Sequence, residues 1–159
     1  MTASQSTHAH GAHPAVRTAA MTVGIVFLVV GVLGFIPGVT TNYDEMAFAG
    51  HASGAMLLGV FQVSVLHNIV HLLYGIAGVA AGRDAWAARN YLVYGGVVYL
   101  ALWIYGLIVG PEATANFVPL NTADDWLHFV LGAAMIAVGL LLTSGRRKVE
   151  GHGHRTAHP

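Results

Sequence analysis

The sequence predicts an all-α membrane protein, a bundle of four transmembrane helices built from two tandem helical hairpins. The first supporting observation is composition: of 159 residues, 9% are charged and 55% hydrophobic, and the mean hydropathy is +0.63. A soluble domain of this size has a large surface to solvate, and so few charges cannot solvate it. The other two observations are four long apolar runs and a strict segregation of the basic residues.

The same composition excludes several classes of protein. High hydrophobicity excludes a disordered chain, and a net charge of zero with neutral histidines leaves no basic surface for nucleic acid. The chain has no cysteine, which excludes disulfides, thiolate nucleophiles and cysteine-ligated zinc. The sequence also contains no nucleophile motif, phosphate-binding loop or glycine-rich nucleotide signature, so it gives no support for an enzyme.

Four apolar runs predict the helices, at about residues 19–36, 62–81, 91–110 and 126–143. Each run is long enough to cross a hydrocarbon core of about 30 Å at about 1.5 Å per residue. Polar and apolar residues do not alternate within the runs, which favours helices over barrel strands. The first run has a signal peptide as its alternative, but it is longer than a usual signal core of about 7–15 residues. We therefore prefer a retained helix.

All Lys and Arg residues fall in three segments that alternate with the apolar runs: before the first, between the second and third, and after the fourth. They are Arg17, Arg83, Arg89, Arg146, Arg147, Lys148 and Arg155. The positive-inside rule assigns these three segments to the cytoplasm. We therefore expect a multi-pass protein of the plasma membrane with both termini in the cytoplasm.

The predicted organisation is one membrane domain between two polar tails. We expect a disordered, histidine-containing cytoplasmic tail over residues 1–16 and a four-helix transmembrane domain over residues 17–144. A basic, histidine-containing cytoplasmic tail is expected over residues 145–159. Histidine-rich tracts can bind metal ions weakly, but a solvated tail without such a role is the favoured interpretation.

A short internal repeat links the second and fourth runs. His67, Asn68, His71 and Gly75 in the second run align with Asp124, Asp125, His128 and Gly132 in the fourth. Both runs enter the membrane from the outer side, as expected for two tandem hairpins, although two apolar helices can also share a Gly and a His by chance. If the aligned histidines lie at equal depth, the second helix enters the hydrocarbon near Ser64. Residues 53–63 then form a short interfacial segment.

These segments also carry a resemblance to a known family. The run from Leu57 to Gly75, with its His67-Asn68-Ile69-Val70-His71 stretch, and the later Asp124-Asp125-Trp126-Leu127-His128 resemble the actinobacterial domain-of-unknown-function family 4383. The members of that family are small four-span integral membrane proteins, and the resemblance covers most of residues 17–143. It implies the four-span topology and points to the same histidines. It implies no activity, because the family has no established one.

The intramembrane histidines are the candidate functional residues, because ionisable groups inside a span are costly and usually functional. His67 and His71 lie four residues apart, as do Asp124 and His128, so each pair shares one face of a helix. If the two helices face each other, these four side chains form a metal site near the outer leaflet. Histidine and carboxylate ligands suit a divalent metal such as zinc.

Three alternatives concern the same cluster. In the metal site, Asn68 and Asp125 are expected to orient the ligating rings. In a second hypothesis, His71 and His128 are the axial ligands of a b-type haem in an electron-transfer bundle, which leaves the other two predicted ligands without a role. In a third, the cluster is a structural hydrogen-bond network across the bundle.

Two classes of function follow from these alternatives. The protein either holds a metal ion or haem at its outer-leaflet cluster, or is a non-catalytic membrane accessory subunit. Besides the lipid bilayer, the expected partners are further copies of the chain or a larger membrane protein. Transport has weak support, because four spans are few for a lone transporter.

Overall fold

The structure is a computed structural model that describes residues 14–144, and this part of the chain contains four long helices. They are α1 (Pro14–Leu33), α2 (Val65–Ala81), α3 (Ala85–Val109) and α4 (Thr122–Ser144). Residues 1–13 of the expected N-terminal tail and the whole expected C-terminal tail lie outside the described residues. The whole predicted membrane domain, residues 17–144, therefore lies within the described residues.

The helices identify a membrane protein. α1, α3 and α4 are each long and apolar enough to cross a bilayer, and α2 is an apolar helix of 17 residues. At about 1.5 Å per residue, α2 is about 26 Å long, slightly shorter than a hydrocarbon core. Large apolar side chains such as Ile76, Leu107 and Val130 are more than half exposed. Such a surface fits contact with lipid rather than with water.

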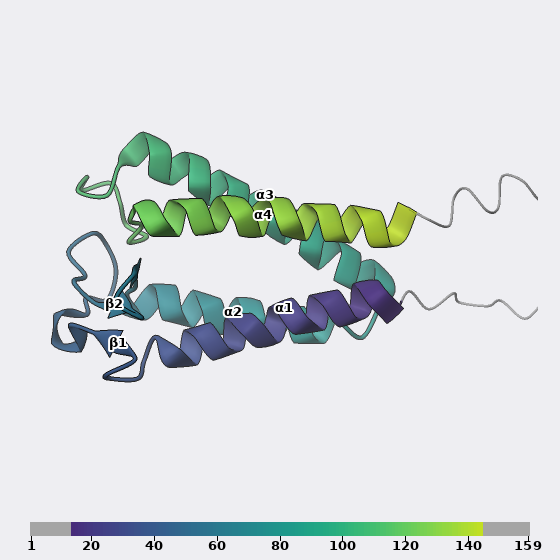
Figure 1. Cartoon of the computed structure of the whole chain (residues 1–159), viewed down its shortest axis with the longest axis horizontal. Helices are drawn as coiled ribbons and strands as arrows, with labels where there is room; N and C mark the ends of the chain where they lie inside the picture. Colours follow the sequence, from purple (N-terminus) through teal and green to yellow (C-terminus); the bar gives the residue numbers. More distant parts are fainter. Residues whose placement is uncertain (1–13, 145–159) are drawn as a thin grey trace, which may run out of the picture.

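The four helices pack mainly as two antiparallel pairs, α1 with α2 and α3 with α4 (Figure 1). Within each pair the helices touch where glycine faces glycine. A Cβ atom on Gly75 would lie 2.7 Å from the carbonyl oxygen of Gly24, and one on Gly132 would lie 2.8 Å from that of Gly96. Small residues thus allow close backbone approach, which is how membrane helices gain packing energy.

Other contacts recur in both pairs. The Asn68 side chain lies over Gly34 in the first pair, as the Asp125 side chain lies over Gly106 in the second. Ring contacts recur as well, because Phe27 meets His71 and Tyr99 meets His128. Every residue named on α1 is separated from its counterpart on α3 by the same number of residues, and the same holds for α2 and α4. The repeat found in the second and fourth runs therefore extends to contacts with the first and third.

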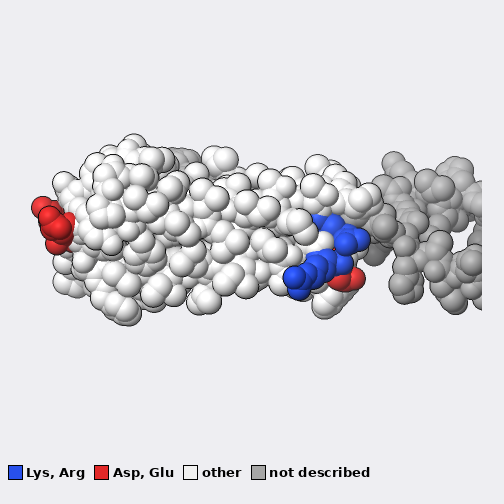
Figure 2. Space-filling model, turned by 90° about the horizontal axis from the view of Figure 1, so that it is seen from below, with Lys and Arg blue, Asp and Glu red and all other residues white. Residues whose placement is uncertain are grey.

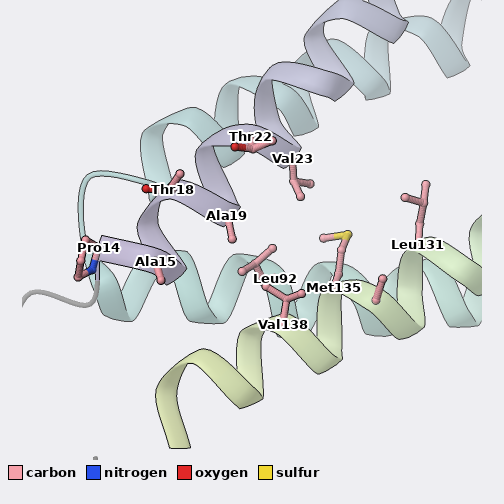
Figure 3. Close-up of a pocket in the computed structure, with 11 residues that line it drawn as sticks. Pro14, Ala15, Thr18, Ala19, Thr22, Val23, Leu92, Leu131, Met135 and Val138 are labelled. Atoms are coloured by element: carbon pink, nitrogen blue, oxygen red, sulfur yellow. The ribbon is translucent and has the colours of Figure 1, made fainter. Parts of the chain in front are cut away.

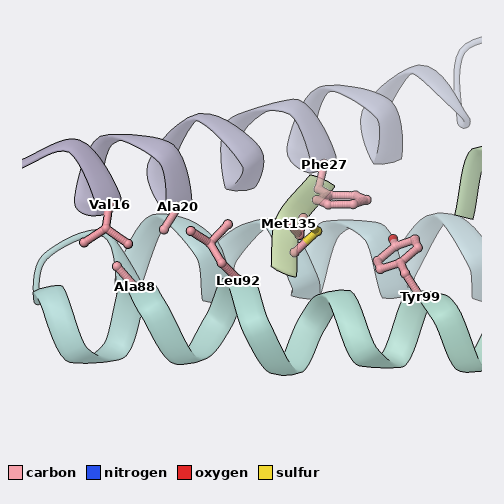
Figure 4. Packing of buried hydrophobic residues seen from close by; sticks show 7 residues of the cluster. All are labelled: Val16, Ala20, Phe27, Ala88, Leu92, Tyr99 and Met135. Atoms are coloured by element: carbon pink, nitrogen blue, oxygen red, sulfur yellow. The ribbon is translucent and has the colours of Figure 1, made fainter. Parts of the chain in front are cut away.

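An apolar core joins the two helix pairs (Figure 4). It consists of Val16, Ala20, Phe27, Ala88, Leu92, Tyr99 and Met135. These residues come from α1, α3 and α4, and in the described structure each is at most 5% exposed. The core fixes how one pair lies against the other, which in turn fixes the shape of the space between them.

Charged side chains lie at the two ends of the molecule, and the surface between them carries none in the view of Figure 2. We call one end the basic end, because it holds the described cations Arg17, Arg83 and Arg89. There, the Arg17 Nε donates to the carbonyl oxygen of Gly82 at 3.1 Å. The opposite end, which carries Asp44, is the sheet end.

A small antiparallel sheet of order β1-β2-β3 forms between α1 and α2, and the sequence analysis does not predict it. Its strands are β1 (Thr40–Thr41), β2 (Met56–Leu57) and β3 (Phe61–Gln62), and a 3-10 helix, η1 (Tyr43–Glu45), follows β1. The segment expected to be interfacial, residues 53–63, contains the β2–β3 hairpin. Leu57 and Val63 of this segment are buried against Val30 and Leu33 of α1, so the hairpin covers the sheet end of the bundle.

α2 begins directly after this hairpin. The Ser64 hydroxyl accepts a hydrogen bond from the backbone N–H of His67 at 3.1 Å, and a serine N-cap of this kind defines a helix start. The helix therefore begins at Val65, three residues after the start expected from hydropathy. This start places His67 and His71 in the first two turns of α2.

Candidate functional site

Three histidines meet between the two helix pairs, and we call His67, His71 and His128 the histidine cluster. The ring centroids of His67 and His71 are 4.4 Å apart on α2, and His128 of α4 lies 6.5 Å from His67. Tyr99 of α3 closes the group, with its ring 5.0 Å from that of His128. His67 is 7% exposed and His128 is 4% exposed. The helices thus bring together three of the four predicted ligands.

The histidine cluster contains polar atoms without partners. Within the described residues, the Nδ1 atom of each of the three histidines is buried and makes no hydrogen bond. The backbone of Gln62 lies close to the ring of His67. An unsatisfied buried donor or acceptor costs about 1–3 kcal/mol. Such groups in a native protein point to a missing partner, either a ligand or an ordered water.

The carboxylate of Asp124 has a structural role. Its Oδ2 atom accepts hydrogen bonds from the backbone N–H groups of Gln62 at 3.0 Å and Asn121 at 3.1 Å. In return, the Asn121 Oδ1 accepts from the backbone N–H of Asp124 at 3.0 Å. This reciprocal arrangement is a capping box at the start of α4. Asp124 therefore caps the first turn of α4 and ties strand β3 to this helix.

The predicted metal and haem sites receive no support from this geometry. In the described part of the chain, no group of three or more His, Asp or Glu side chains is placed to hold a metal ion. For haem, a planar macrocycle would have to lie between His71 and His128. The ring of His67 lies close to both of them, with centroids 4.4 Å from His71 and 6.5 Å from His128, and the haem hypothesis gives His67 no role.

Asn68 and Asp125 were expected to orient the ligating rings, but the structure places their side chains elsewhere. Their side chains lie over Gly34 and Gly106, and the Asn68 amide contacts the sulfur of Met46 at 4.0 Å. Among residues 14–144, no hydrogen bond joins either side chain to a histidine, and none joins two members of the histidine cluster. The hypothesis of a hydrogen-bond network within the cluster is therefore not supported either.

Two cavities flank the histidine cluster. The α1/α4 cavity, of about 320 Å³, lies between α1 and α4 beside the β2–β3 hairpin. The α2/α3 cavity, of about 260 Å³, lies between α2 and α3. All three members of the cluster line both cavities, and so does Tyr99. These four side chains therefore form a polar partition between two largely apolar spaces.

This arrangement fits recognition of an uncharged polar group. A neutral imidazole offers one donor and one acceptor, and the surrounding walls are aliphatic and aromatic. Apolar pockets with a few convergent polar groups are the usual form of small-molecule sites. The cluster can therefore hydrogen-bond a carbonyl or hydroxyl of a ligand whose remaining surface is apolar.

Sequence reasoning missed Tyr99 and the capping role of Asp124. A signal for the second was present, because Asn121 lies three residues before Asp124, the spacing of a capping box. Tyr99 lies outside the segments that carry the aligned histidines. Its contact with His128 identifies Tyr99 as the counterpart of Phe27, which contacts His71.

The chain belongs to the family described as a domain of unknown function (DUF4383), whose profile matches residues 17–141. This match confirms the resemblance drawn from the histidine-containing segments. No curated protein and no solved structure shows a significant match to the chain. The comparisons thus establish the family and assign no function.

Proposed function

We propose that this DUF4383 protein is a four-span protein of the plasma membrane that binds a lipophilic ligand through the histidine cluster. The observation that carries the proposal is a set of three histidines that line an apolar cavity and whose buried Nδ1 atoms have no hydrogen-bond partner among the described residues. The ligand supplies the hydrogen-bonding group that these nitrogens lack. The cavity accommodates the apolar part of the ligand.

The topology in this proposal is two tandem hairpins, α1 with α2 and α3 with α4. The matched glycine contacts of the two pairs support it, because α2 packs on α1 as α4 packs on α3. The basic end then faces the cytoplasm by the positive-inside rule, and both termini lie there. Since α2 and α4 both begin at the sheet end, the histidine cluster lies in the outer half of the membrane.

The bilayer is the proposed route by which the ligand reaches the cluster. The rim of the α1/α4 cavity carries Val26, Leu58 and Leu127, which are 52%, 63% and 38% exposed. Exposed aliphatic side chains at this position contact lipid tails. A ligand that is already dissolved in the membrane therefore reaches the cavity without crossing a polar surface.

The proposal is tested with the ring-preserving variant His128→Phe. His51→Phe is the matched control, because His51 lies in the loop between β1 and β2 and lines neither cavity. Each full-length protein is purified from native membranes in mild detergent, and its bound lipids are extracted and quantified. We expect a near-stoichiometric compound on the wild type and on His51→Phe that is lost from His128→Phe. The same compounds in equal amounts on all three proteins would overturn the proposal.

A further inference from the structure

The α2/α3 cavity is the counterpart of the α1/α4 cavity in the internal repeat. The residues of α3 that line it follow lining residues of α1 by the same number of positions as Gly96 follows Gly24. In the same way, lining residues of α2 are related to lining residues of α4 as Gly75 is to Gly132. The two cavities therefore have the same construction. The corresponding lining residues are Val26 and Val98, Phe27 and Tyr99, Val30 and Leu102, Val70 and Leu127, and His71 and His128.

Aliphatic side chains form part of the rim of both cavities. Val26 of the α1/α4 cavity and Val98 of the α2/α3 cavity are each 52% exposed, and Val70 beside Val98 is 50% exposed. Exposed aliphatic side chains at these positions contact lipid tails. The route through the bilayer that is proposed for the first cavity therefore exists for the second as well.

The histidine cluster is shared by the two cavities. His67, His71 and His128 line the α2/α3 cavity as they line the α1/α4 cavity, and among the described residues their Nδ1 atoms have no hydrogen-bond partner. A ligand in one cavity meets only one side of this polar partition. The other side is then still open to a hydrogen-bonding group from the second cavity.

The α2/α3 cavity offers no counter-charge to an ionic head group. Among the described residues that line it, none is Lys, Arg, Asp or Glu, and most of its wall is aliphatic or aromatic. A phosphate or ammonium group placed here would be desolvated without an opposite charge, which is strongly unfavourable. The polar group that this cavity can accept is therefore uncharged.

The two cavities differ toward the basic end. On one side an apolar groove of about 630 Å³, the inner groove, adjoins the α1/α4 cavity and shares Thr22, Val23 and Leu131 with it (Figure 3). On the other side the counterpart of Leu131 is Tyr74, whose hydroxyl lies over Gly95, the counterpart of Val23. The Tyr74 ring thus occupies the space that corresponds to the groove. The α2/α3 cavity is therefore confined to the sheet end of the bundle.

We propose that the α2/α3 cavity is a second binding site for an uncharged lipophilic molecule with a hydrogen-bonding group. One chain then binds two such molecules, one on each side of the histidine cluster. This inference rests on the proposed function, because it extends the histidine-dependent site to the second cavity. The two sites are related by the internal repeat, and the inner groove adjoins only the first.

The test uses a long-chain alcohol that carries a photoactivatable diazirine, added to the full-length protein in vesicles of synthetic phosphatidylcholine. Labelling that an excess of hexadecanol suppresses is specific, and the labelled residues are mapped by mass spectrometry of peptides. Val26→Trp obstructs the rim of the α1/α4 cavity, and Val98→Trp obstructs that of the α2/α3 cavity. Ile25→Trp and Val97→Trp are the matched controls, because Ile25 and Val97 are 50% and 51% exposed and line neither cavity.

We expect specific labels in both cavities of the wild type and of the two controls. Val98→Trp lowers the specific labelling at Val70 by about tenfold and leaves that at Leu127 unchanged. Val26→Trp has the reverse effect. His128→Phe lowers the labelling in both cavities, because His128 lines both.

Each other outcome overturns a defined part of the inference. If all specific, His128-dependent labels lie in one cavity, the assignment of two sites is wrong and the proposed function stands. If both cavities are labelled but His128→Phe has no effect, the two sites stand and the proposed role of the histidine cluster fails. If neither cavity is labelled specifically, or if the rim variants act no differently from their controls, both this inference and the proposed function fail.

Discussion

The variant His128→Phe distinguishes two hypotheses for the histidine cluster, because a ligand site and a structural hydrogen-bond network predict opposite changes in stability. His128 is 4% exposed, and its Nδ1 makes no hydrogen bond among the described residues. Removing an unsatisfied buried polar atom recovers a penalty of about 1–3 kcal/mol. Phenylalanine is slightly larger, but both cavities adjoin the ring, so overpacking is small. We expect ligand-free His128→Phe to be about 1 kcal/mol more stable than the ligand-free wild type.

The assay is reversible unfolding of delipidated protein in mixed micelles, with His51→Phe as the control. His51→Phe is expected to leave the free energy of unfolding unchanged, because its ring is outside the cluster. A destabilisation of more than about 1 kcal/mol in His128→Phe would refute the reasoning. That result would mean that the imidazole holds the bundle together through hydrogen bonds.

Two further predictions concern packing and topology. A Cβ on Gly75 would lie 2.7 Å from backbone atoms of α1, so Gly75→Ala should destabilise the protein by about 1–2 kcal/mol after the gain in helix propensity. The control Ala77→Val adds bulk at an exposed position and should cost little; equal losses would contradict the glycine contact. For topology, single cysteines at Ala52 and Ala115 should react with an impermeant thiol reagent in intact cells, whereas one at Ala85 should not. The reverse labelling pattern would contradict the proposed orientation.

Hydropathy predicted the helices well because a long apolar run is stable in a bilayer only as a helix, in which its backbone groups are hydrogen-bonded. It placed their ends less well, since caps rather than hydropathy define them. α1 begins at Pro14, five residues before the apolar run, and α2 begins only after Ser64, which caps it. The strands of the sheet escaped prediction because two-residue strands are too short to show an alternating pattern.

The histidine cluster was predictable in part. The four-residue spacing of His67 and His71 recurs in Asp124 and His128, which indicated that His71 and His128 lie at similar depth. In the structure both belong to the histidine cluster. The sequence analysis proposed Asp124 as a metal ligand and did not foresee that its Oδ2 atom accepts hydrogen bonds from two backbone N–H groups. The cavities depend on how the two helix pairs lie against each other. That placement follows from the core cluster to which Leu92 and Met135 belong, and periodicity does not reveal such a cluster.

Nitrogen NMR of the imidazole rings tests most directly whether the histidine cluster binds a ligand. The full-length protein carries nitrogen-15 in its histidines and is placed in vesicles of synthetic phosphatidylcholine, with and without the neutral lipid fraction of the native membrane. His128→Phe assigns the His128 resonances. We predict that the neutral lipids shift the Nδ1 resonance of His128 toward that of a hydrogen-bonded imidazole, while the His51 resonances stay unchanged. Identical cluster spectra in the two kinds of vesicle would contradict the account.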